Sequence, residues 1–564
     1  MGNFITKGNF IALFTLVAST LNAQPWFQTV YQNKGTDEIP YDLEVLYGTG
    51  SPYHYSIYMT GASGTNSSTV STLDLLVMET NEYSNLLFSE TFGNSSIRDV
   101  GQCAVFDNQT LFIGGLVGPS SGNDGTMWRF DASSNTMIDY TFYNSDGATN
   151  FRSIVHNGTS CVIGGPTMMT SAPNVVREFG LLEVDPSNPL NITGGVAAGD
   201  PTPSNKIHSA RNHIWNATTN EYFQVGYEQS SNDAWFMRAD GGYGVLDLVR
   251  YNYPLCNNDI SFAGIEQLTT STYLILGQIE NCSLLFGGKD ILLLVVDDSG
   301  NILNQAIYGE AGDDIPRAVR ISTANGVAVI TGTTNSFSSG GDHDVFMMAV
   351  DPTLTITVAK TFPASSDDEL MAGSNTPMQL VEDSLVGEAV LIAAYQDNSS
   401  TNEKDVLLIK SPLQLYADES CVEYPVFQST QPSISATAED IVSTPWGNAI
   451  NSNYNNVDLA LSEAEFCVRA KTTTSTGNSI TDENTIKLYP NPAIDIVQID
   501  FSTPTETSGT ISLFDISGRL LIQEQLSANT SLKSMDLTAL SSGMYFVKIQ
   551  FDNGESQELR IQKD

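Results

Sequence analysis

An acidic residue followed by a short apolar run recurs along this chain and constrains its fold more than any other feature. The frame is clearest in GGDHDVFMMAVDPT, residues 340–353, where Asp344 precedes the run and Asp351 ends it. Seven copies are separated by 50, 54, 55, 57, 54 and 61 residues, and five of them end on Asp. The copies are DLLVMETN from Asp74, DGTMWRFD from Asp124, EFGLLEVD from Glu178, DAWFMRAD from Asp233, DILLLVVD from Asp290, DVFMMAVD from Asp344 and DVLLIKSP from Asp405. A fixed period of this length predicts an array of equivalent structural units.

Each unit contains more than the framed run. A second apolar segment lies upstream and in most copies ends in glycine, as in VAVITG at Gly332. A third segment precedes it, as at 317–323, and a fourth follows the frame, as at 356–362. Four short strands per repeat, separated by Gly and Asp turns, are typical of a β-propeller blade. The sequence therefore predicts an all-β chain with a seven-bladed β-propeller over residues 24–416.

The seventh repeat has three clear strands and lacks its fourth. Residues 26–38, WFQTVYQNKGTDE, match 303–314 in the fifth repeat, LNQAIYGEAGDD. We expect the mature N-terminus to supply the missing outer strand and to close the ring, which removes an exposed sheet edge. The repeats resemble the propeller-like repeats of secreted bacterial proteins, most closely over 309–353, and this resemblance implies a fold without naming a ligand.

The charge balance argues against two classes of partner. Lys and Arg number 24 against 64 Asp and Glu, a formal net charge of −40. A surface this acidic repels nucleic-acid phosphates and anionic lipid headgroups, and we interpret the acidity of the protein mainly as a solubility feature.

The N-terminus is typical of a secretory signal peptide. Lys7 lies in a short polar start, the apolar run 10–18 follows, and small residues lead to Ala23. This pattern predicts a signal peptide over 1–23, cleaved before Gln24. The run is far shorter than the ~20 residues of a transmembrane helix, and no later segment reaches that length. We therefore expect export and no transmembrane segment.

The C-terminal part, residues 486–564, shows alternating apolar residues between turn signals and predicts about seven short strands in a small Ig-like β-sandwich. It resembles the type A C-terminal sorting domain of the type IX secretion system of Gram-negative bacteria. The motif residues that carry the resemblance are Tyr489, Pro490, Asn491, Pro492, Asp515, Gly518, Arg519, Leu540, Gly543, Tyr545, Lys548 and Lys563. The resemblance implies recognition by an outer-membrane translocon, in many cases removal of the domain, and a cargo that is released or attached to surface polysaccharide. The implied location is the outer cell surface or the extracellular space, reached through the periplasm.

Between these parts lies 417–485, rich in Ser, Thr and Asn, in which 471–479 predicts a flexible linker. Cys421 and Cys467 bracket most of it. In similar proteins such a segment separates propeller and sorting domain, so we expect a small disulfide-closed β segment. Cys256 and Cys282 fall in loops on one face of the fifth blade and form a second candidate disulfide. Cys103 and Cys161 lie in apolar strands, where either a buried free thiol or a bond is compatible with the sequence.

The cluster Asp342, His343 and Asp344 is the clearest candidate site, because carboxylate and imidazole groups bind divalent cations or support catalysis. Asp344 belongs to the frame shared by all seven repeats, and we interpret it and Asp351 as turn acids. His343 has no counterpart in the other repeats. Weak Ca²⁺ binding by the acidic turns stays open. The other histidines, His54, His156, His208 and His213, are scattered, and we interpret each as a surface or core residue.

No nucleophile elbow, HExxH or phosphate-binding loop occurs. The acidic pairs Asp313-Asp314 and Asp367-Asp368 open the sixth and seventh repeats and are repeat features rather than a glycosidase pair. We therefore predict a non-enzymatic surface or secreted scaffold that binds carbohydrate or protein and has no catalytic or cofactor site. The alternative is a secreted polysaccharide hydrolase or lyase with acids at the propeller channel.

Overall fold

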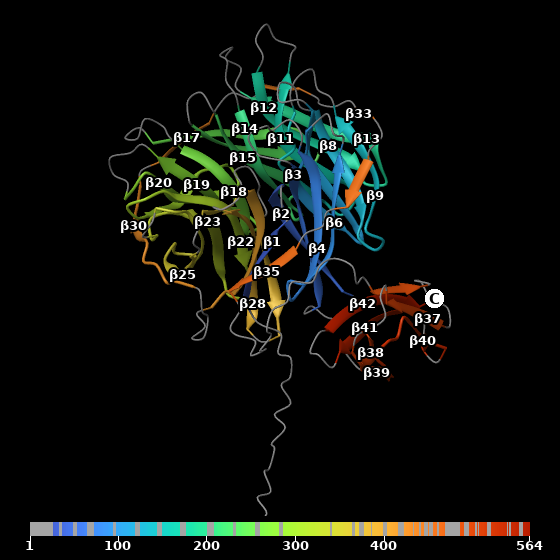
Figure 1. Cartoon of the computed structure of the whole chain (residues 1–564). Helices are drawn as coiled ribbons and strands as arrows, with labels where there is room; N and C mark the ends of the chain where they lie inside the picture. Colours follow the sequence, from blue (N-terminus) through green and yellow to red (C-terminus); the bar gives the residue numbers. More distant parts are fainter. Residues whose placement is uncertain are drawn as a thin grey trace, which may run out of the picture. The chain divides into compact units, whose positions relative to one another are not determined.

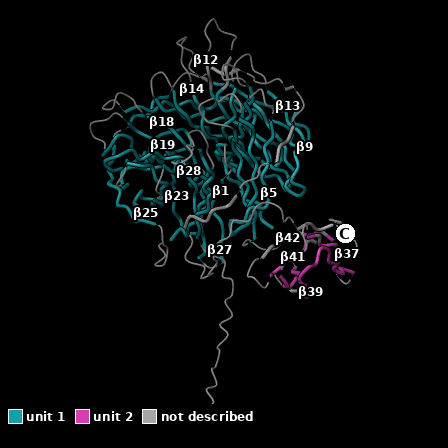
Figure 2. Tube along the Cα trace, in the orientation of Figure 1, with its two compact units in different colours: residues 1–469 teal, residues 470–564 magenta. Residues whose placement is uncertain are grey.

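The computed structural model divides the chain into two compact units, Met1–Arg469 and Ala470–Asp564 (Figure 2). Every regular element that it describes is a β-strand (Figure 1). Nothing in the described part of the chain forms a helix long and apolar enough to cross a membrane. The structure describes all residues except 1–25, 33–35, 49–53, 65–72, 94–97, 119–123, 144–148, 170–175, 200–207, 229–232, 254–259, 281–285, 339–340, 364–366, 371–376, 385, 399–402, 415–421, 433, 439–441, 445–448, 451–454, 459–461, 468–485, 490–495, 502–504, 506, 516–519, 539, 541–542, 552–555 and 564.

Seven antiparallel sheets are described in the first unit, each named here by its first strand in the chain order of the repeats. The first four are β2 (Asp37–Tyr47), β3 (Tyr55–Gly64), β4 (Asp74–Asn81), β5 (Leu86–Gly93); β6 (Arg98–Asp107), β7 (Thr110–Gly118), β8 (Asp124–Asp131), β9 (Thr136–Tyr143); β10 (Ser153–His156), β11 (Cys161–Met169), β12 (Val176–Asp185), β13 (Asn188–Gly199); and β14 (His208–Asn216), β15 (Glu221–Glu228), β16 (Ala234–Asp240), β17 (Val245–Asn252). The other three are β18 (Ile260–Thr269), β19 (Thr272–Glu280), β20 (Lys289–Asp297), β21 (Ile302–Gly309); β22 (Asp314–Ser322), β23 (Val327–Thr334), β24 (Asp344–Val350), β25 (Ile356–Phe362); and β26 (Asp368–Glu369), β27 (Met378–Asp383), β28 (Gly387–Asn398), β29 (Glu403–Pro412) with β1 (Phe27–Gln32).

The first strands of these sheets contact one another in a closed cycle. Contacts join β2 to β6, β6 to β10, β10 to β14, β14 to β18 and β18 to β22, and β27 joins β22 back to β2. Seven buried apolar clusters each lie between two consecutive sheets of this cycle. Burial between sheets, rather than within one sheet, therefore holds the unit together, because a single four-stranded sheet cannot bury both of its faces alone.

The framed runs of the sequence are the third strands of their sheets. β24 is buried along its whole length, which explains a continuous apolar run instead of an alternating pattern. The Asp that ends the frame closes a turn: the amides of Thr353 and Thr355 donate to Asp351 Oδ1 at 2.8 and 2.9 Å. The frame-ending acids of four other sheets, Asp131, Asp185, Asp240 and Asp297, accept backbone N–H groups in the same way. The interpretation of these residues as turn acids is confirmed.

The N-terminal strand β1 joins the last sheet. It pairs antiparallel with β29, with Phe27 opposite Lys410 and Tyr31 opposite Val406. The Tyr31 hydroxyl donates to the Ser84 carbonyl of the β2 sheet at 2.6 Å. In the fourth strand of the β18 sheet, Tyr308 makes the equivalent bond to the Leu354 carbonyl of the next sheet at 2.5 Å. The alignment of 26–38 with 303–314 pairs these two tyrosines.

Residues 422–467, here called the belt, add an outermost strand to six of the seven described sheets. The belt strands are β30 (Gln428–Thr430), β31 (Ser435–Ala438), β32 (Val442–Thr444), β33 (Ala449–Ile450), β34 (Asn455–Asp458) and β35 (Ser462–Cys467). They pair in turn with β21, β17, β13, β9, β5 and β1. Thr361 of the β22 sheet forms a bridge with Glu423 before this series begins. The strands that pair with the belt, from β21 to β1, are therefore met in the reverse of their order in the chain.

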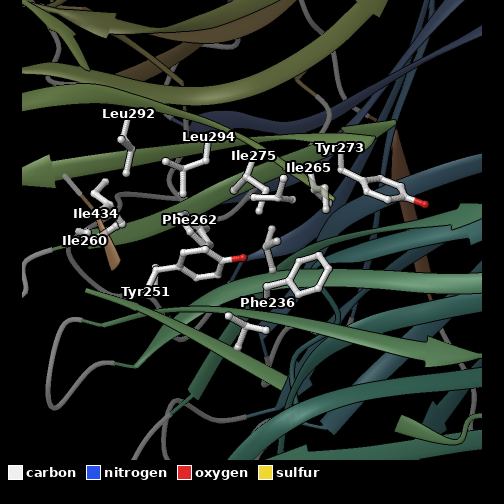
Figure 3. Close-up of a cluster of buried hydrophobic side chains, with 14 of the residues drawn as sticks. Phe236, Tyr251, Ile260, Phe262, Ile265, Tyr273, Ile275, Leu292, Leu294 and Ile434 are labelled. Atoms are coloured by element: carbon white, nitrogen blue, oxygen red, sulfur yellow. The ribbon is translucent and has the colours of Figure 1, made fainter. Parts of the chain in front are cut away.

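This arrangement differs from the separate β segment expected between 417 and 485. The described belt strands pair with the sheets of the first unit and not with one another. Short strands such as Ala449–Ile450 cannot form a core of their own, and the sheet edges offer them unpaired backbone groups. Phe427 is 6% exposed and packs against Phe337 and Phe346. Ile434 belongs to the same buried cluster as Ile260 and Phe262 (Figure 3).

The second unit contains two described sheets around one apolar core. One sheet contains β36 (Ile486–Tyr489), β37 (Ile496–Phe501) and β40 (Leu532–Asp536), and the other contains β39 (Leu520–Leu526), β38 (Gly509–Asp515), β41 (Gly543–Phe551) and β42 (Ser556–Lys563). Val497 and Ile499 from the first sheet share the core with Ile511 and Val547 from the second.

Candidate functional site

His343, the residue singled out by the repeat, lies against two acidic residues of the last sheet. Its Nδ1 is 3.5 Å from Asp367 Oδ1 and 3.7 Å from Glu369 Oε1. Its backbone amide donates to Asp367 Oδ1 at 2.8 Å. Within the described residues, no group of three or more His, Cys, Asp or Glu side chains is arranged to hold a metal ion. The Asp342–His343–Asp344 cluster is thus not such a group, and Asp344 is buried at the start of β24.

The remaining histidines do not gather. His213 is 1% exposed, its Nδ1 lies 2.5 Å from Ser153 Oγ, and burial lowers its pKa to about 3. His54 lies 3.1 Å from Glu82, and His156 lies 3.8 Å from Asp107. The side chain of His208 is outside the described residues. The buried Ser153–His213 pair has no described acidic partner and is shielded from solvent, which suits packing between sheets better than catalysis.

The structure describes the side chains of two of the six cysteines. Cys103 and Cys161 are free and buried, and burial raises the pKa of both thiols, that of Cys161 to about 12. Cys256, Cys282 and Cys421 lie outside the described residues, as does the side chain of Cys467. The cleavage position at Ala23 and Gln24 also lies outside them.

The motif residues of the C-terminal unit lie on neighbouring strands where they are described. Asp515 at the end of β38 is opposite Tyr545 of β41, and Gly543 is opposite Lys563 of β42. Lys548 is opposite Ser512, and the Tyr545 and Lys563 side chains are each 7% exposed. Pro490, Asn491, Pro492, Gly518 and Arg519 fall outside the described residues. Tyr489 ends β36 in the other sheet.

A second constellation, which the sequence did not reveal, lies on the first strands of the cycle. In β22, the Ile315 carbonyl approaches Gly332 of the second strand so closely that any Cβ there would clash with it. The same clash recurs in four other sheets, at the pairs Ile39–Gly61, Val100–Gly115, Asn150–Gly165 and Ser209–Gly226, and a looser approach, 3.0 Å from the Cβ position, occurs at Ser261–Gly277. The residue two positions after this carbonyl residue therefore has the same structural position in all six sheets. In five of the sheets it is the extra residue of a register shift in the first strand. These equivalent residues are Tyr41, Gln102, Arg152, Arg211, Ala263 and Arg317.

Three of these equivalent residues, Arg152, Arg211 and Arg317, are arginines from three different sheets, and they are called the arginine level. Burial, together with the positive charge of Arg211, lowers the pKa of the Arg317 guanidinium to about 10. Burial raises the pKa of Tyr41. The charges of Arg98 and Arg152 and a hydrogen bond with Arg98 act in the opposite direction. Arg211 and Arg317 lie two sheets apart in the cycle, as do Tyr41 and Arg152. Because these side chains interact across an intervening sheet, they lie toward the centre of the cycle.

Three residues further along the first strands, about 10 Å at ~3.3 Å per residue, lies an acid level formed by Glu44, Glu266, Arg320 and Gln379. Arg320 donates to Glu266 Oε1 at 2.8 Å, and Gln379 Nε2 donates to Glu44 Oε1 at 3.0 Å. Burial raises the pKa of Glu44 to about 7, despite the opposing charge of Arg320. Burial also raises the pKa of the neighbouring Asp42 well above its ordinary value.

The His343 cluster and the arginine level are connected through Glu369. The Tyr395 hydroxyl donates to Glu369 Oε2 at 2.7 Å. Both Glu369 and Tyr395 act electrostatically on Arg317, whose Nε donates to the Leu370 carbonyl at 3.1 Å. Arg211 donates to the Tyr227 hydroxyl at 2.9 Å, and its guanidinium lies 5.0 Å from the centre of that ring. Described contacts therefore connect His343 to Arg317 through Glu369 and Tyr395.

Comparison with known proteins identifies the C-terminal unit. Residues 487–562 match the family described as the secretion system C-terminal sorting domain. The chain therefore carries a type IX sorting domain, is a substrate of that secretion system and is delivered to the cell surface or the extracellular space. No curated protein matches the chain.

Solved structures are similar only at a low level. Hydrazine synthase of Kuenenia stuttgartiensis is 9% identical with a TM-score of 0.40, over 65% of this chain and 96% of that one. Sqt1 of Chaetomium thermophilum, bound to the N-terminus of ribosomal protein L10, is 11% identical with a TM-score of 0.33, over 63% and 93%. The extracellular domain of a putative one component system from B. thetaiotaomicron is 9% identical with a TM-score of 0.24, over 96% and 100%. Similarity at this level assigns no function to the chain.

Proposed function

We propose that this chain is an exported, non-enzymatic binding scaffold whose seven sheets are the blades of a β-propeller. In this proposal the signal peptide is removed after Ala23, and β1 closes the ring as the fourth strand of the last blade. The C-terminal unit is an Ig-like β-sandwich that directs secretion. The ligand, a carbohydrate or a protein, binds at the centre of the ring beside the arginine level.

One observation carries the proposal of a central site. The chain has only 24 Lys and Arg among 564 residues, yet three arginines, Arg152, Arg211 and Arg317, occupy equivalent positions on three different sheets. Like charges that share a partly buried region destabilise a fold, so such a cluster is a candidate functional site. Loops and strand ends at one face of a rigid ring are a common position for ligand binding.

The test is a glycan and protein array probed with the mature chain, residues 24–564. We expect binding to a restricted set of ligands that are recovered unchanged, and weaker binding by the double variant Arg211→Gln/Arg317→Gln. Absence of binding to every arrayed ligand, or equal binding by the double variant, would contradict a scaffold with a central site.

A second candidate function has its own observation. His343 lies within 3.7 Å of Glu369, and Glu369 accepts a hydrogen bond from Tyr395 beside Arg317. An imidazole, a tyrosine and an arginine near one another provide a base, an acid and a countercharge for cleaving an acidic polysaccharide.

Turnover separates the two functions. The mature chain is incubated with polygalacturonate and with neutral glucan, and new reducing ends and unsaturated products are measured. Cleavage that is lost in His343→Ala and in Tyr395→Phe would replace the scaffold with a lyase or hydrolase, whereas binding without cleavage supports the scaffold.

A further inference from the structure

We infer that neighbouring sheets of the first unit share protons between buried carboxyl groups, so that their junctions are closed in weak acid and loosen as the pH rises. The inference goes beyond the proposed binding function and does not depend on it. It rests on a junction at which the first strand of one sheet meets the third strand of the sheet before it. Each junction is named here by the first strands of its two sheets.

The backbone joins the two strands at this junction. In the β22–β26 junction, Asp368 donates its amide to the His343 carbonyl at 2.7 Å, directly before Asp344, the acid that begins the framed run. In the β2–β6 junction, the Asp99 amide donates at 2.6 Å to the carbonyl of the residue directly before Asp74, the framed acid of that sheet. An acid of the first strand therefore lies beside an acid of the third strand.

Two such acids are brought close together at the β2–β6 junction. Asp74 Oδ1 and Asp99 Oδ2 lie 2.1 and 2.9 Å from the point that a Cβ on Gly93 would occupy. In the β18–β22 junction, Asp290 Oδ1 lies 2.0 Å from the same point on Gly309, the equivalent residue at the end of β21. These glycines leave room for the carboxyl groups. Like charges at this separation favour the state in which one of the two acids holds a proton.

Three carboxyl groups at the junctions are buried and incompletely hydrogen-bonded. Glu38, Asp290 and Asp368 are at most 1% exposed, and Glu38 Oε2, Asp290 Oδ1 and Asp368 Oδ1 accept no hydrogen bond from the described residues. A buried charged oxygen without a donor is costly. A proton on the same carboxyl removes that charge and provides an O–H, which a neighbouring carboxylate can accept.

The charged groups around Asp368 favour its protonated form. Burial raises its pKa to about 8, and three nearby carboxylates act in the same direction: Asp344, Asp367 and Asp397. Two basic groups contact these neighbours, since Lys404 Nζ lies 3.5 Å from Asp397 and His343 Nδ1 lies 3.5 Å from Asp367.

The β26–β2 junction repeats this arrangement. The amide directly before Asp405, the framed acid of the last sheet, donates to Asp37 Oδ1 at 2.9 Å. Burial raises the pKa of the adjacent Glu38 to about 7, hydrogen bonds from Thr36 and Ser63 oppose this, and the charges of Asp405 and Asp37 reinforce it. A second junction therefore holds a proton near neutral pH.

The β18–β22 junction does the same at lower pH. Lys289, directly before the framed acid Asp290, forms a backbone bridge with Asp313. Burial, with the charges of Asp314 and Asp313, raises the pKa of Asp290 to about 6. Protons that only the closed junctions bind stabilise them, and this contribution is lost as the pH rises from the ordinary carboxyl pKa of about 4 toward the raised values.

The test is hydrogen exchange of the mature chain, residues 24–564, measured by mass spectrometry from pH 6.5 to 8.5 and corrected for the intrinsic effect of pH on exchange. Peptides that contain Asp368 report the opening of the β22–β26 junction through its amide. We expect protection of this amide against exchange to fall about tenfold or more across the range, because a group with a pKa of about 8 loses its proton within it.

Variants locate the protons. Asp368→Asn should remove most of this pH dependence at the β22–β26 junction, because the carboxamide stays neutral and still donates a hydrogen bond. Glu38→Gln should do the same at the β26–β2 junction, where protection in the unaltered chain falls only a few-fold because the pKa is about 7. Asp185→Asn is the matched control and should keep the full pH dependence, since hydrogen bonds from Ser187 hold the pKa of Asp185 below its ordinary value. Thermal melts at pH 6.5 verify folding, and if one variant fails to fold the other provides the test.

Two results would overturn the inference. Protection at the β22–β26 junction that stays constant from pH 6.5 to 8.5, or that falls equally in the unaltered chain and in Asp368→Asn, means that no titrating proton holds the junction. Calcium chloride that restores protection at pH 8.5 in the unaltered chain, and has no effect on Asp368→Asn, means that the carboxyl groups bind a cation there instead of a proton.

Discussion

The pKa values of carboxyl groups in this acidic chain shift in two opposite directions. Exposed turn acids such as Asp351 accept backbone N–H groups, and those hydrogen bonds hold the pKa below its ordinary value. Buried acids behave differently, because loss of hydration disfavours their charged form. Burial raises the pKa of Glu38 and of Glu44 to about 7 and that of Asp368 to about 8.

These shifts predict that the folded chain loses stability as the pH rises from 6.5 to 8.5. In this window the folded state holds protons that the unfolded state has released, so the free energy of unfolding falls with pH. His213, whose pKa is lowered to about 3 by burial, acts in the opposite direction, because the unfolded imidazole still binds protons near pH 6.5; its effect over the window is only about 0.4 kcal/mol. We expect a loss of roughly 1–3 kcal/mol across the window. Urea unfolding at pH 6.5, 7.5 and 8.5 measures it.

A pair of variants assigns the effect. Glu44→Gln should make the dependence on pH shallower, since it removes one of the titrating groups. Asp351→Asn should leave the slope unchanged, because Asp351 is ionised in both states throughout this range. Stability that is constant or increases between pH 6.5 and 8.5 would contradict the prediction.

At the scale of elements, the belt depends on a few side chains that reach buried clusters. Phe427 is 6% exposed, whereas its neighbour Val426 is 79% exposed. Phe427→Ala should therefore destabilise the first unit by about 3 kcal/mol, within the range for truncating a buried aromatic side chain. It should also speed proteolytic cleavage within 422–467. Limited proteolysis and thermal melts measure both, and Val426→Ala is the matched control.

If Phe427→Ala and Val426→Ala are cleaved at equal rates, the belt is held by backbone pairing alone. That result would remove the side-chain anchors from the description of the belt.

The tyrosine bonds between sheets give a second prediction at this scale. Tyr31→Phe removes the hydrogen bond to the Ser84 carbonyl at the junction between the last sheet and the β2 sheet. We expect a loss of about 1 kcal/mol, the usual net value of a hydrogen bond. Tyr308→Phe should cost the same, because Tyr308 has the equivalent bond to Leu354. Thermal melts compare them with Tyr83→Phe, an exposed control; a negligible loss in Tyr31→Phe alone would show that this junction lacks the role of the others.

For the whole molecule, the repeat predicted the strands and their turns because each is encoded locally. A buried third strand reads as an apolar run, and Asp351 closes a turn with its own neighbours. The belt was not predictable in this way, since SATA and AI have no apolar pattern and take their positions from sheet edges. The arginine level was missed because Arg152, Arg211 and Arg317 belong to different repeats. Aligning the first strands on Ile315–Gly332 and its equivalents, rather than on the framed acids, would have found the shared position.

Secretion supplies the prediction at this scale. Deletion of residues 470–564 should trap the chain in the periplasm of a bacterium with a type IX system, because the sorting domain lies there. Cell fractionation and protease treatment of intact cells measure the location. Fusion of 470–564 to a periplasmic reporter should deliver the reporter to the surface. Surface delivery of the truncated chain would contradict the assignment of this unit as the sorting signal.

The reverse course of the belt has a mechanical consequence. The C-terminal unit follows β35, the six-residue belt strand beside β1, in the chain. Going back along the belt from β35, the next strands pair with the β2 sheet and then with the β6 sheet. A pulling force applied through the C-terminal unit would peel the belt one sheet at a time, beginning at the junction where the N-terminal strand lies and ending at Glu423. Such a release is stepwise, and the first strand to bear the force is β35, the longest described strand of the belt.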